Sequence, residues 1–187
     1  MYTLNTNPIS NALFAASFSN AQDYYHGLGV QGLMGLYKQE TQFSSSSVAT
    51  FVPGVVYKAS LGFEINRNSN FAVSAYPFAG FYFNSQIGGY LGVQLPVLAE
   101  IYFGDMDDQN FYIGAGGAWG FIAQDGEGGS IVGPQLGMGG QFEFRDQLVG
   151  LRASYTYGLN KTKTEGITYT RDSKSMISVG LYYLLGQ

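Results

Sequence analysis

The chain has 187 residues, a formal net charge of −4 and no cysteine, which excludes disulfides, thiolate nucleophiles and cysteine-based metal sites. Hydrophobic residues make up 45% and aromatic residues 16% of the sequence, whereas charged residues make up only 12%, about half the usual globular share. Basic residues do not cluster beside aromatic ones, which argues against a nucleic-acid partner, and no unbroken apolar run reaches about 18 residues, which excludes a transmembrane helix.

Residues 1–22 include "NPISNALFAASFSNAQ", which is similar to the late part of a secretory signal, with small residues leading to Ala21 and Gln22. The first lysine of the chain is Lys38, so no positively charged region precedes this stretch. We expect 1–22 to be a signal remnant or a loosely held segment, with a short capping helix as the alternative. Residues 23–187 contain no long polar linker and are predicted to form one domain.

Clusters of Gly, Asn, Asp and Ser divide the chain into eight stretches in which apolar and polar residues alternate, as in β-strands. These stretches are 26–38, 47–64, 70–83, 88–104, 110–123, 130–145, 147–160 and 174–186. Short connections such as "NRNS" and "RDQ" alternate with mostly longer ones at 39–46, 124–129 and 160–173. Long and short loops that alternate between antiparallel strands are typical of membrane barrels, whose two ends differ in loop length.

One face of each predicted strand is apolar and free of charge, as in the last stretch, where Ile177, Val179, Leu181, Tyr183 and Leu185 share one side. The opposite face consists largely of Gly, Ser, Gln and Tyr. A soluble barrel would bury the apolar face and expose the other face to water. A face exposed to water should be rich in Lys and Glu, and the second face of these strands is not. We therefore predict that the apolar face points outward into lipid.

Aromatic residues on the predicted outward face fall into two levels along the strands. Those near the short turns are Phe63, Phe71, Phe103, Phe111, Phe144 and Tyr183, and those toward the long loops are Phe51, Phe81, Phe83, Trp119, Phe121, Tyr155 and Tyr157. Two aromatic belts around an aliphatic band match a bilayer with two interfaces. High β-propensity of aromatic residues at strand ends is the alternative explanation.

Four prolines oppose the strand prediction, because proline cannot donate to a ladder and a closed barrel has no edge strand to hold it. Pro53, Pro77, Pro96 and Pro134 lie inside predicted strands. We expect a bulge or kink at each of them, and a bulge would shift the face assignment by one residue beyond that point.

The final strand carries a recognisable motif. Its spacing, with Ser178, then Gly180, then Tyr183, then Leu185, resembles the C-terminal β-signal of outer-membrane proteins, although Gly186 and Gln187 follow where that family usually ends. With the strand count and loop rhythm, residues 24–187 resemble the small eight-stranded barrels of OmpA-transmembrane and OmpX type, and the Gly- and Tyr-rich character is similar to versions from Bacteroidota.

The resemblance implies an all-β, eight-stranded antiparallel up-and-down transmembrane barrel in the outer membrane of a Gram-negative bacterium. It implies insertion by the barrel-assembly machinery, surrounding lipid and lipopolysaccharide, and periplasmic termini. It implies no catalytic residue, and neither a cofactor nor a metal site is expected.

Charged residues on the predicted inner face lie toward the periplasmic half: Lys58, Glu64, Glu100, Glu143 and Arg152. Isolated charges inside a narrow barrel would be costly, so we expect them to pair with one another. The interior of an eight-stranded barrel is just wide enough for side chains, and inward tyrosines would fill much of it. We predict a network that blocks the lumen, with a gate as the alternative.

Two further features bear on function. The loop "NKTKTEGITYTRD" and the residue after it carry Lys161, Lys163, Arg171 and Lys174, which could bind lipopolysaccharide phosphates or a protein partner, or simply be solvated.

His26 precedes the first strand near the predicted periplasmic rim. Lipid A-modifying barrels, which resemble this size class, place a catalytic histidine near the outer leaflet instead.

The sequence thus predicts a non-enzymatic outer-membrane barrel with a plugged lumen, in a structural or adhesive role or as a subunit of a larger assembly. A protein partner would meet its external loops or its periplasmic face. The alternative is a narrow channel or a carrier of small hydrophobic ligands that uses the lumen, for which Val52, Val56, Phe78 and Leu98 are inward apolar candidates. A lipid-modifying enzyme is disfavoured by the position of His26.

Overall fold

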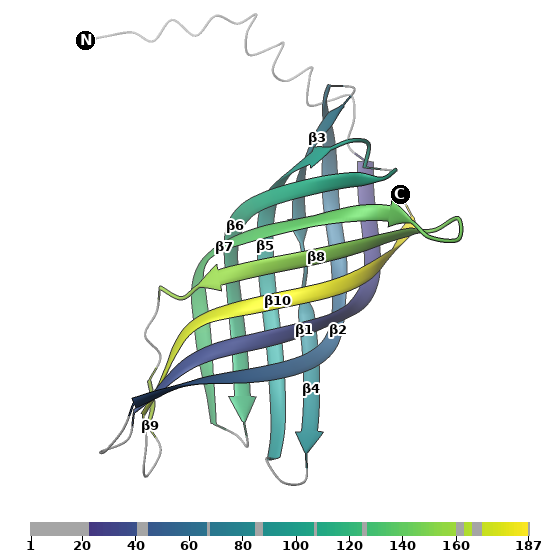
Figure 1. Cartoon of the computed structure of the whole chain (residues 1–187). Helices are drawn as coiled ribbons and strands as arrows, with labels where there is room; N and C mark the ends of the chain where they lie inside the picture. Colours follow the sequence, from purple (N-terminus) through teal and green to yellow (C-terminus); the bar gives the residue numbers. More distant parts are fainter. Residues whose placement is uncertain are drawn as a thin grey trace, which may run out of the picture.

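The computed structural model describes residues 23–40, 45–66, 68–84, 88–106, 108–124, 127–159, 163–165 and 170–186 (Figure 1). Its strands are β1 (Asp23–Glu40), β2 (Ser45–Asn66), β3 (Ser69–Ala75), β4 (Phe78–Asn84), β5 (Gly88–Phe103), β6 (Asn110–Gln124), β7 (Glu127–Glu143), β8 (Leu148–Tyr157), β9 (Lys163–Glu165) and β10 (Thr170–Gly186). Residues 1–22, for which a signal remnant was one prediction, lie outside the described residues. The described part of the chain includes no helix that is long and apolar enough to cross a membrane.

Strand β1 closes the sheet into a ring, because it pairs antiparallel with β2 on one side and with β10 on the other. The other neighbours follow in chain order, with β3 and β4 both lying between β2 and β5. β3 and β4 are two halves of one strand interrupted at Tyr76 and Pro77, so the ring has the predicted eight strands. The short β9 pairs with β10 beyond the end of β8.

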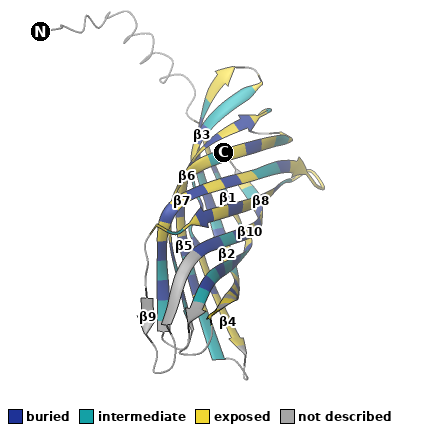
Figure 2. Cartoon of the chain, turned by 60° about the vertical axis from the view of Figure 1, so that its left-hand side comes forward, coloured by how far each residue is buried: buried dark blue, intermediate teal, exposed yellow. Residues whose placement is uncertain are grey.

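Large apolar residues are exposed on the outside of this ring, and the predicted assignment of faces is confirmed. Figure 2 shows how buried and exposed residues alternate along the strands. In β8, for example, exposed and buried residues alternate: Leu151 and Tyr155 are exposed, whereas the residues that follow each of them, Arg152 and Thr156, are buried. Exposed fractions reach 64% at Val30 and 65% at Leu136. A soluble monomer does not expose an apolar surface of this extent, so the outside of the ring suits a hydrocarbon medium.

Prolines do not shift the faces of the strands. Among the described residues, register shifts occur between His26 and Gly27, between Leu36 and Tyr37, and near Ile65, none of them at a proline. The prediction of a slip at the prolines is therefore wrong, and only Pro77 interrupts a strand. The fixed φ of proline is compatible with extended backbone, so alternation continues through each of them.

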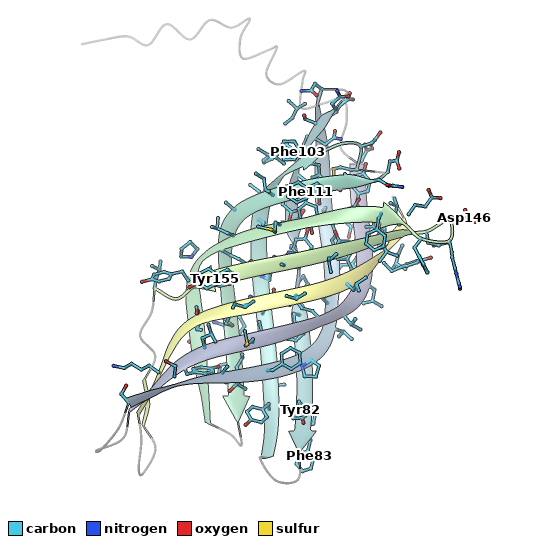
Figure 3. All side chains as sticks on the ribbon, in the orientation of Figure 1. Tyr82, Phe83, Phe103, Phe111, Asp146 and Tyr155 are labelled. Atoms are coloured by element: carbon cyan, nitrogen blue, oxygen red, sulfur yellow. The ribbon has the colours of Figure 1, made fainter. Side chains whose placement is uncertain are left out.

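The predicted alternation of short and long connections is wrong for most loops, because the strands extend into the stretches assigned to loops. The connections 41–44, 85–87 and 125–126 are no longer than 104–109 at the other end, and among the connections between the described strands only the one from β8 to β10, which contains β9, is long. We call the end where β5 connects to β6 and β7 connects to β8 the short-turn end, and the opposite end, toward which β9 lies, the long-loop end (Figure 1). Figure 3 shows Phe103 and Phe111 near the short-turn end and Phe83 at the long-loop end. The rings of Phe103 and Phe111 face each other across β5 and β6, with centroids 6.3 Å apart.

Candidate functional site

Three of the five charged residues predicted to line the lumen are buried in it. Lys58 on β2, Glu100 on β5 and Arg152 on β8 are each at most 2% exposed. Glu64 and Glu143 are exposed, which corrects the prediction for these two residues. Both lie near strand ends at the short-turn rim, where water can hydrate a carboxylate without a burial penalty.

Glu100 is the central acceptor of the buried network. Ser74 donates its hydroxyl to Glu100 at 2.6 Å, and Tyr102 donates at 2.9 Å. Tyr76 donates to both carboxylate oxygens, at 2.8 and 3.0 Å. Three hydroxyl groups thus satisfy a carboxylate that has no exposed surface, which is the condition under which a buried charge is tolerated.

Lys58 reaches the same centre from β2. Its Nζ donates to the hydroxyls of Tyr102 at 3.1 Å and Tyr182 at 3.4 Å. The same ammonium lies 4.9 Å from the ring centroid of Tyr182 and 5.6 Å from that of Tyr112, within the range of cation–π attraction. The Tyr102 hydroxyl accepts from Lys58 and donates to Glu100, so it stands between the two opposite charges.

Arg152 stacks on the network rather than pairing with a carboxylate. Its guanidinium carbon lies 4.0 Å from the ring centroid of Tyr76, and Nη2 donates to Gln135 at 3.5 Å. Nε and Nη1 have no hydrogen-bond partner within the described part of the chain. The contacts therefore differ from the predicted direct ion pairs, because tyrosines connect the charges. We call Lys58, Tyr76, Glu100, Tyr102, Arg152 and Tyr182 the lumen plug.

The alternation of residues correctly predicted that the tyrosines of the lumen plug point into the barrel. It predicted only that they fill space there, not that they form hydrogen bonds with the buried charges. It did not show that they would converge on Glu100, because that depends on how strands distant in sequence are aligned. A signal was nevertheless present: Ser74 and Tyr76, and likewise Glu100 and Tyr102, are two residues apart and so share the inner face of one strand.

The half of the lumen toward the long loops is apolar. Its buried cluster consists of Leu33, Tyr37, Val52, Val56, Tyr76, Phe78, Leu98, Ile122, Ile131, Met176 and Tyr182, of which Tyr76 and Tyr182 belong to the lumen plug. Amides span the lumen at an intermediate level, where Gln31 donates to Gln94 at 3.4 Å and Gln94 donates to Thr156 at 3.4 Å. The lumen thus has a charged, hydroxyl-rich half and an apolar half.

The barrel wall is incompletely hydrogen-bonded along the seam between β2 and β4. In the described residues these strands pair at Val56 with Phe78, at Val55 with Ala79, and at Gly54 with Gly80. Beyond this point, residues 45–53 of β2 continue beside β1, whereas residues 81–84 of β4 continue beside β5. Figure 1 shows the two strands diverging toward the long-loop end.

Prolines account for the end of this ladder. Tyr57 donates its N–H across the seam to the carbonyl of Pro77 at 3.0 Å, and Pro77 has no N–H to return. Hydrogen-bonding positions alternate along an antiparallel strand, so Val55 and Pro53 face β4 as well. Val55 and Ala79 can exchange both hydrogen bonds. At Pro53 the donor is missing again, and the pairing stops.

A cavity of ≈ 310 Å³ lies where the seam opens. It is lined by Ala49, Thr50, Phe51 and Pro53 of β2, by Tyr82 of β4 and by Tyr90 of β5. We call this cavity the seam window. Thr50 is a buried inner-face residue, whereas Ala49, Phe51 and Pro53 are exposed on the outer face. Because residues of both faces of β2 line it, the cavity lies within the opening of the wall.

The four residues of the β-signal lie on β10, the strand that closes the ring against β1. Ser178 and Gly180 are buried, and Ser178 lies 2.6 Å from the hydroxyl of Ser154. Tyr183 and Leu185 are exposed on the outer face. The role of this segment in assembly stays a prediction.

The basic loop is described in part. Lys161 lies outside the described residues, and Lys163 on β9 is aligned with Asp172 on β10. Arg171 and Lys174 lie on β10. Their predicted contact with lipopolysaccharide or a protein partner remains a prediction.

His26 lies within β1 rather than before it, because the pairing of β1 with β2 begins at Asp23, which corrects the prediction that this histidine precedes the first strand. Its ring centroid is 5.6 Å from that of Tyr24 and 6.4 Å from that of Tyr57. The described residues include no group of three His, Asp or Glu side chains that could hold a metal ion.

No family model and no curated protein matches this sequence. Among solved structures, the outer membrane protein AlkL, determined in lipid bilayers, is 10% identical, with a TM-score of 0.57 over 90% of this chain and 92% of that chain. The two chains share a fold. This protein is an eight-stranded antiparallel up-and-down transmembrane β-barrel.

Looser similarity extends to other small barrels. Ail, the attachment invasion locus protein of Yersinia pestis, is 13% identical with a TM-score of 0.38, over 85% of this chain and 98% of its own. The N-terminal β-barrel domain of Pseudomonas aeruginosa OprF is 16% identical with a TM-score of 0.40, over 85% and 99% of the two chains.

Proposed function

We propose that this protein is an integral outer-membrane barrel of OmpA-transmembrane or OmpX type, without enzymatic activity, that closes its own lumen. In this proposal it serves a structural or adhesive role, or is a subunit of a larger outer-membrane assembly in a Gram-negative bacterium. The barrel-assembly machinery would recognise the β-signal, and lipid and lipopolysaccharide would surround the exposed apolar face. The basic residues of the 160–173 loop are the candidates for contact with phosphates or a partner.

The observation that carries the proposal is the lumen plug. Glu100 and Lys58 are completely buried, and Tyr102 on β5 bonds to both of them. Tyr182 on β10 accepts from Lys58, and Tyr76, between β3 and β4, donates to Glu100. An aqueous pore would instead keep such charges hydrated. A blocked lumen supports a function on the outside of the barrel, at its loops and lipid-facing surface.

Planar-bilayer recordings test this proposal. We expect the folded wild-type protein to show no stable conductance, and the double variant Tyr102→Ala/Tyr182→Ala to conduct, because it removes two side chains that fill the lumen beside Lys58. Insertion is checked separately by a heat-dependent shift in gel migration. Steady conductance of the wild-type barrel would contradict the plug and favour a narrow channel.

A second candidate is a carrier of small hydrophobic ligands. The apolar half of the lumen, with Leu33, Val52 and Met176 fully buried or nearly so, favours this candidate over an ion channel. Such a ligand would need a route into the lumen that avoids the lumen plug.

A further inference from the structure

We propose that the seam window binds a free hydrocarbon molecule dissolved in the membrane and admits it sideways into the apolar half of the lumen. This inference rests on the proposed membrane location of the barrel. It differs from a pore, because the path leads through the wall between β2 and β4 rather than along the barrel axis.

The lining of the seam window includes residues from both sides of the wall. Phe51 and Pro53 face outward, where the barrel surface is apolar. Thr50 faces inward, and the next inward residue along β2, Val52, belongs to the apolar lumen cluster. On the other edge, Tyr82 and Tyr90 have ring centroids 6.3 Å apart. A molecule in the window would therefore touch both the lipid-facing surface and the lumen side.

An open ladder at membrane depth requires an explanation. Backbone that is not paired within a ladder is tolerated inside a membrane only where it lies within protein or lines a cavity. Proline is the device that opens this ladder, since Pro53 and Pro77 both lack donors on the side that faces the seam. The inward-facing Gly54 and Gly80 come so close at the last pair that a Cβ on either would meet the other strand's backbone. The seam is thus tight up to Gly54 and open directly beyond it.

The chemistry of the window selects the ligand. The window is lined by the small residues Ala49 and Thr50 and by four residues with rings, Phe51, Pro53, Tyr82 and Tyr90. None of these residues carries a charge. A cavity of ≈ 310 Å³ is at the lower limit of ligand pockets, which are about 300–1,000 Å³. That size suits one small hydrocarbon rather than a two-chain lipid. The lumen plug would stop the molecule from continuing to the short-turn end.

Photolabelling in proteoliposomes tests the site directly. The probes are a short n-alkane bearing a diazirine and a phosphatidylcholine with the same diazirine in one acyl chain. We expect the free alkane to label Thr50 and Tyr90, which face the lumen. Leu136 on the lipid-facing surface is the positive control, and the fully buried Tyr112, which lies beside Lys58 of the lumen plug and outside the apolar half of the lumen, is the negative control.

A disulfide across the seam provides the decisive variant, because the native chain contains no cysteine. If the alignment of β2 with β4 is continued past its last observed pair, Phe51 lies opposite Phe83. A disulfide in Phe51→Cys/Phe83→Cys requires the diverging strands to come together, so its formation closes the window. The matched control is Val55→Cys/Ala79→Cys, which joins two residues that are already paired. We expect labelling of Thr50 and Tyr90 to be lost in the oxidised window variant, restored by reductant, and unchanged in the control.

Other outcomes would overturn the inference. Equal labelling of Tyr90 in the oxidised and reduced forms would show that the molecule does not pass through the seam. Labelling by the phosphatidylcholine probe alone would show that a lipid chain occupies it. If the disulfide does not form, Thr50→Trp fills the window and must abolish Tyr90 labelling while the heat-dependent gel shift is kept. Absence of labelling at Leu136 would instead contradict the membrane location itself.

Discussion

At the scale of single residues, Glu100 shows how this barrel keeps a negative charge in a narrow interior. Hydroxyl donors from Ser74, Tyr76 and Tyr102 surround it, and the two buried cations lie beyond the tyrosines. Replacing the carboxylate by an amide would leave Lys58 and Arg152 without a counter-charge in the lumen.

We therefore expect Glu100→Gln to lower the free energy of unfolding by about 3 kcal/mol, the lower part of the range for breaking a buried charge pair, because hydroxyls separate the charges here. Urea unfolding in lipid vesicles measures the change. The double variant Glu100→Gln/Lys58→Met should recover part of the loss, because it also removes a cation. A Glu100→Gln variant as stable as the wild type would contradict the role of the charge.

The turn between β7 and β8 offers a second residue-level test. Phe144 and Gln147 exchange backbone hydrogen bonds of 2.7 and 3.2 Å, and the two residues between them have positive φ, 53° at Arg145 and 60° at Asp146. Left-handed backbone costs a non-glycine residue about 1–2 kcal/mol. Asp146→Gly should therefore stabilise the barrel by about 1 kcal/mol in urea unfolding, whereas Asp146→Val should destabilise it. The opposite order of the two variants would contradict this account.

Residue alternation predicted which way most side chains point, but not their depth. Lys58 and Arg152 lie well inside the barrel, whereas Glu64 and Glu143 lie near strand ends where the wall no longer encloses them. A period of two residues contains no information about where the rim lies. The convergence of tyrosines on Glu100 was equally hidden, since it depends on pairing between strands.

At the scale of elements, the strand number could be predicted because turn residues and alternation are local signals, but the lengths of the connections could not, because pairing with a neighbour extends strands into stretches rich in turn residues. The prolines were recognised as exceptions, but the expected register slips were wrong, and only Pro77 interrupts a strand among the described residues. Proline changes the ladder rather than the strand: the pairing of β2 with β4 ends beside Pro53, and that of β7 with β8 ends beside Pro134. Which neighbour each missing donor faces depends on alignment, so the seam window could not be foreseen.

Restoring a donor at Pro53 should extend the ladder. In Pro53→Val the new N–H faces β4 opposite Phe81, and one additional net hydrogen bond is worth about 1 kcal/mol. We expect the amide of Phe81 to exchange about fivefold more slowly with deuterium in this variant. Pro134→Val, on the far side of the barrel, is the control and should leave this amide unchanged. Unaltered exchange in Pro53→Val would show that something other than the missing donor separates the strands.

At the scale of the whole molecule, the single tryptophan reports on the medium around the barrel. Trp119 on β6 is 40% exposed on the outer face, whereas Ile122 on the same strand is 4% exposed and faces the lumen. Brominated lipids should quench the fluorescence of the wild-type protein strongly. They should quench Trp119→Phe/Ile122→Trp weakly, because its tryptophan faces inward. Equal quenching of the two proteins would contradict the orientation of the faces.

The burial of Lys58, Glu100 and Arg152 on three different strands also constrains how this barrel can enter a bilayer. Each of these strands, if it crossed the hydrocarbon core alone, would place an unpaired charge there, which is energetically costly. Their hydroxyl and aromatic partners assemble around them only when the sheet has curled so that opposite walls meet. Insertion and curling must therefore proceed together, and a flat, partly inserted sheet is not a stage through which this chain can pass.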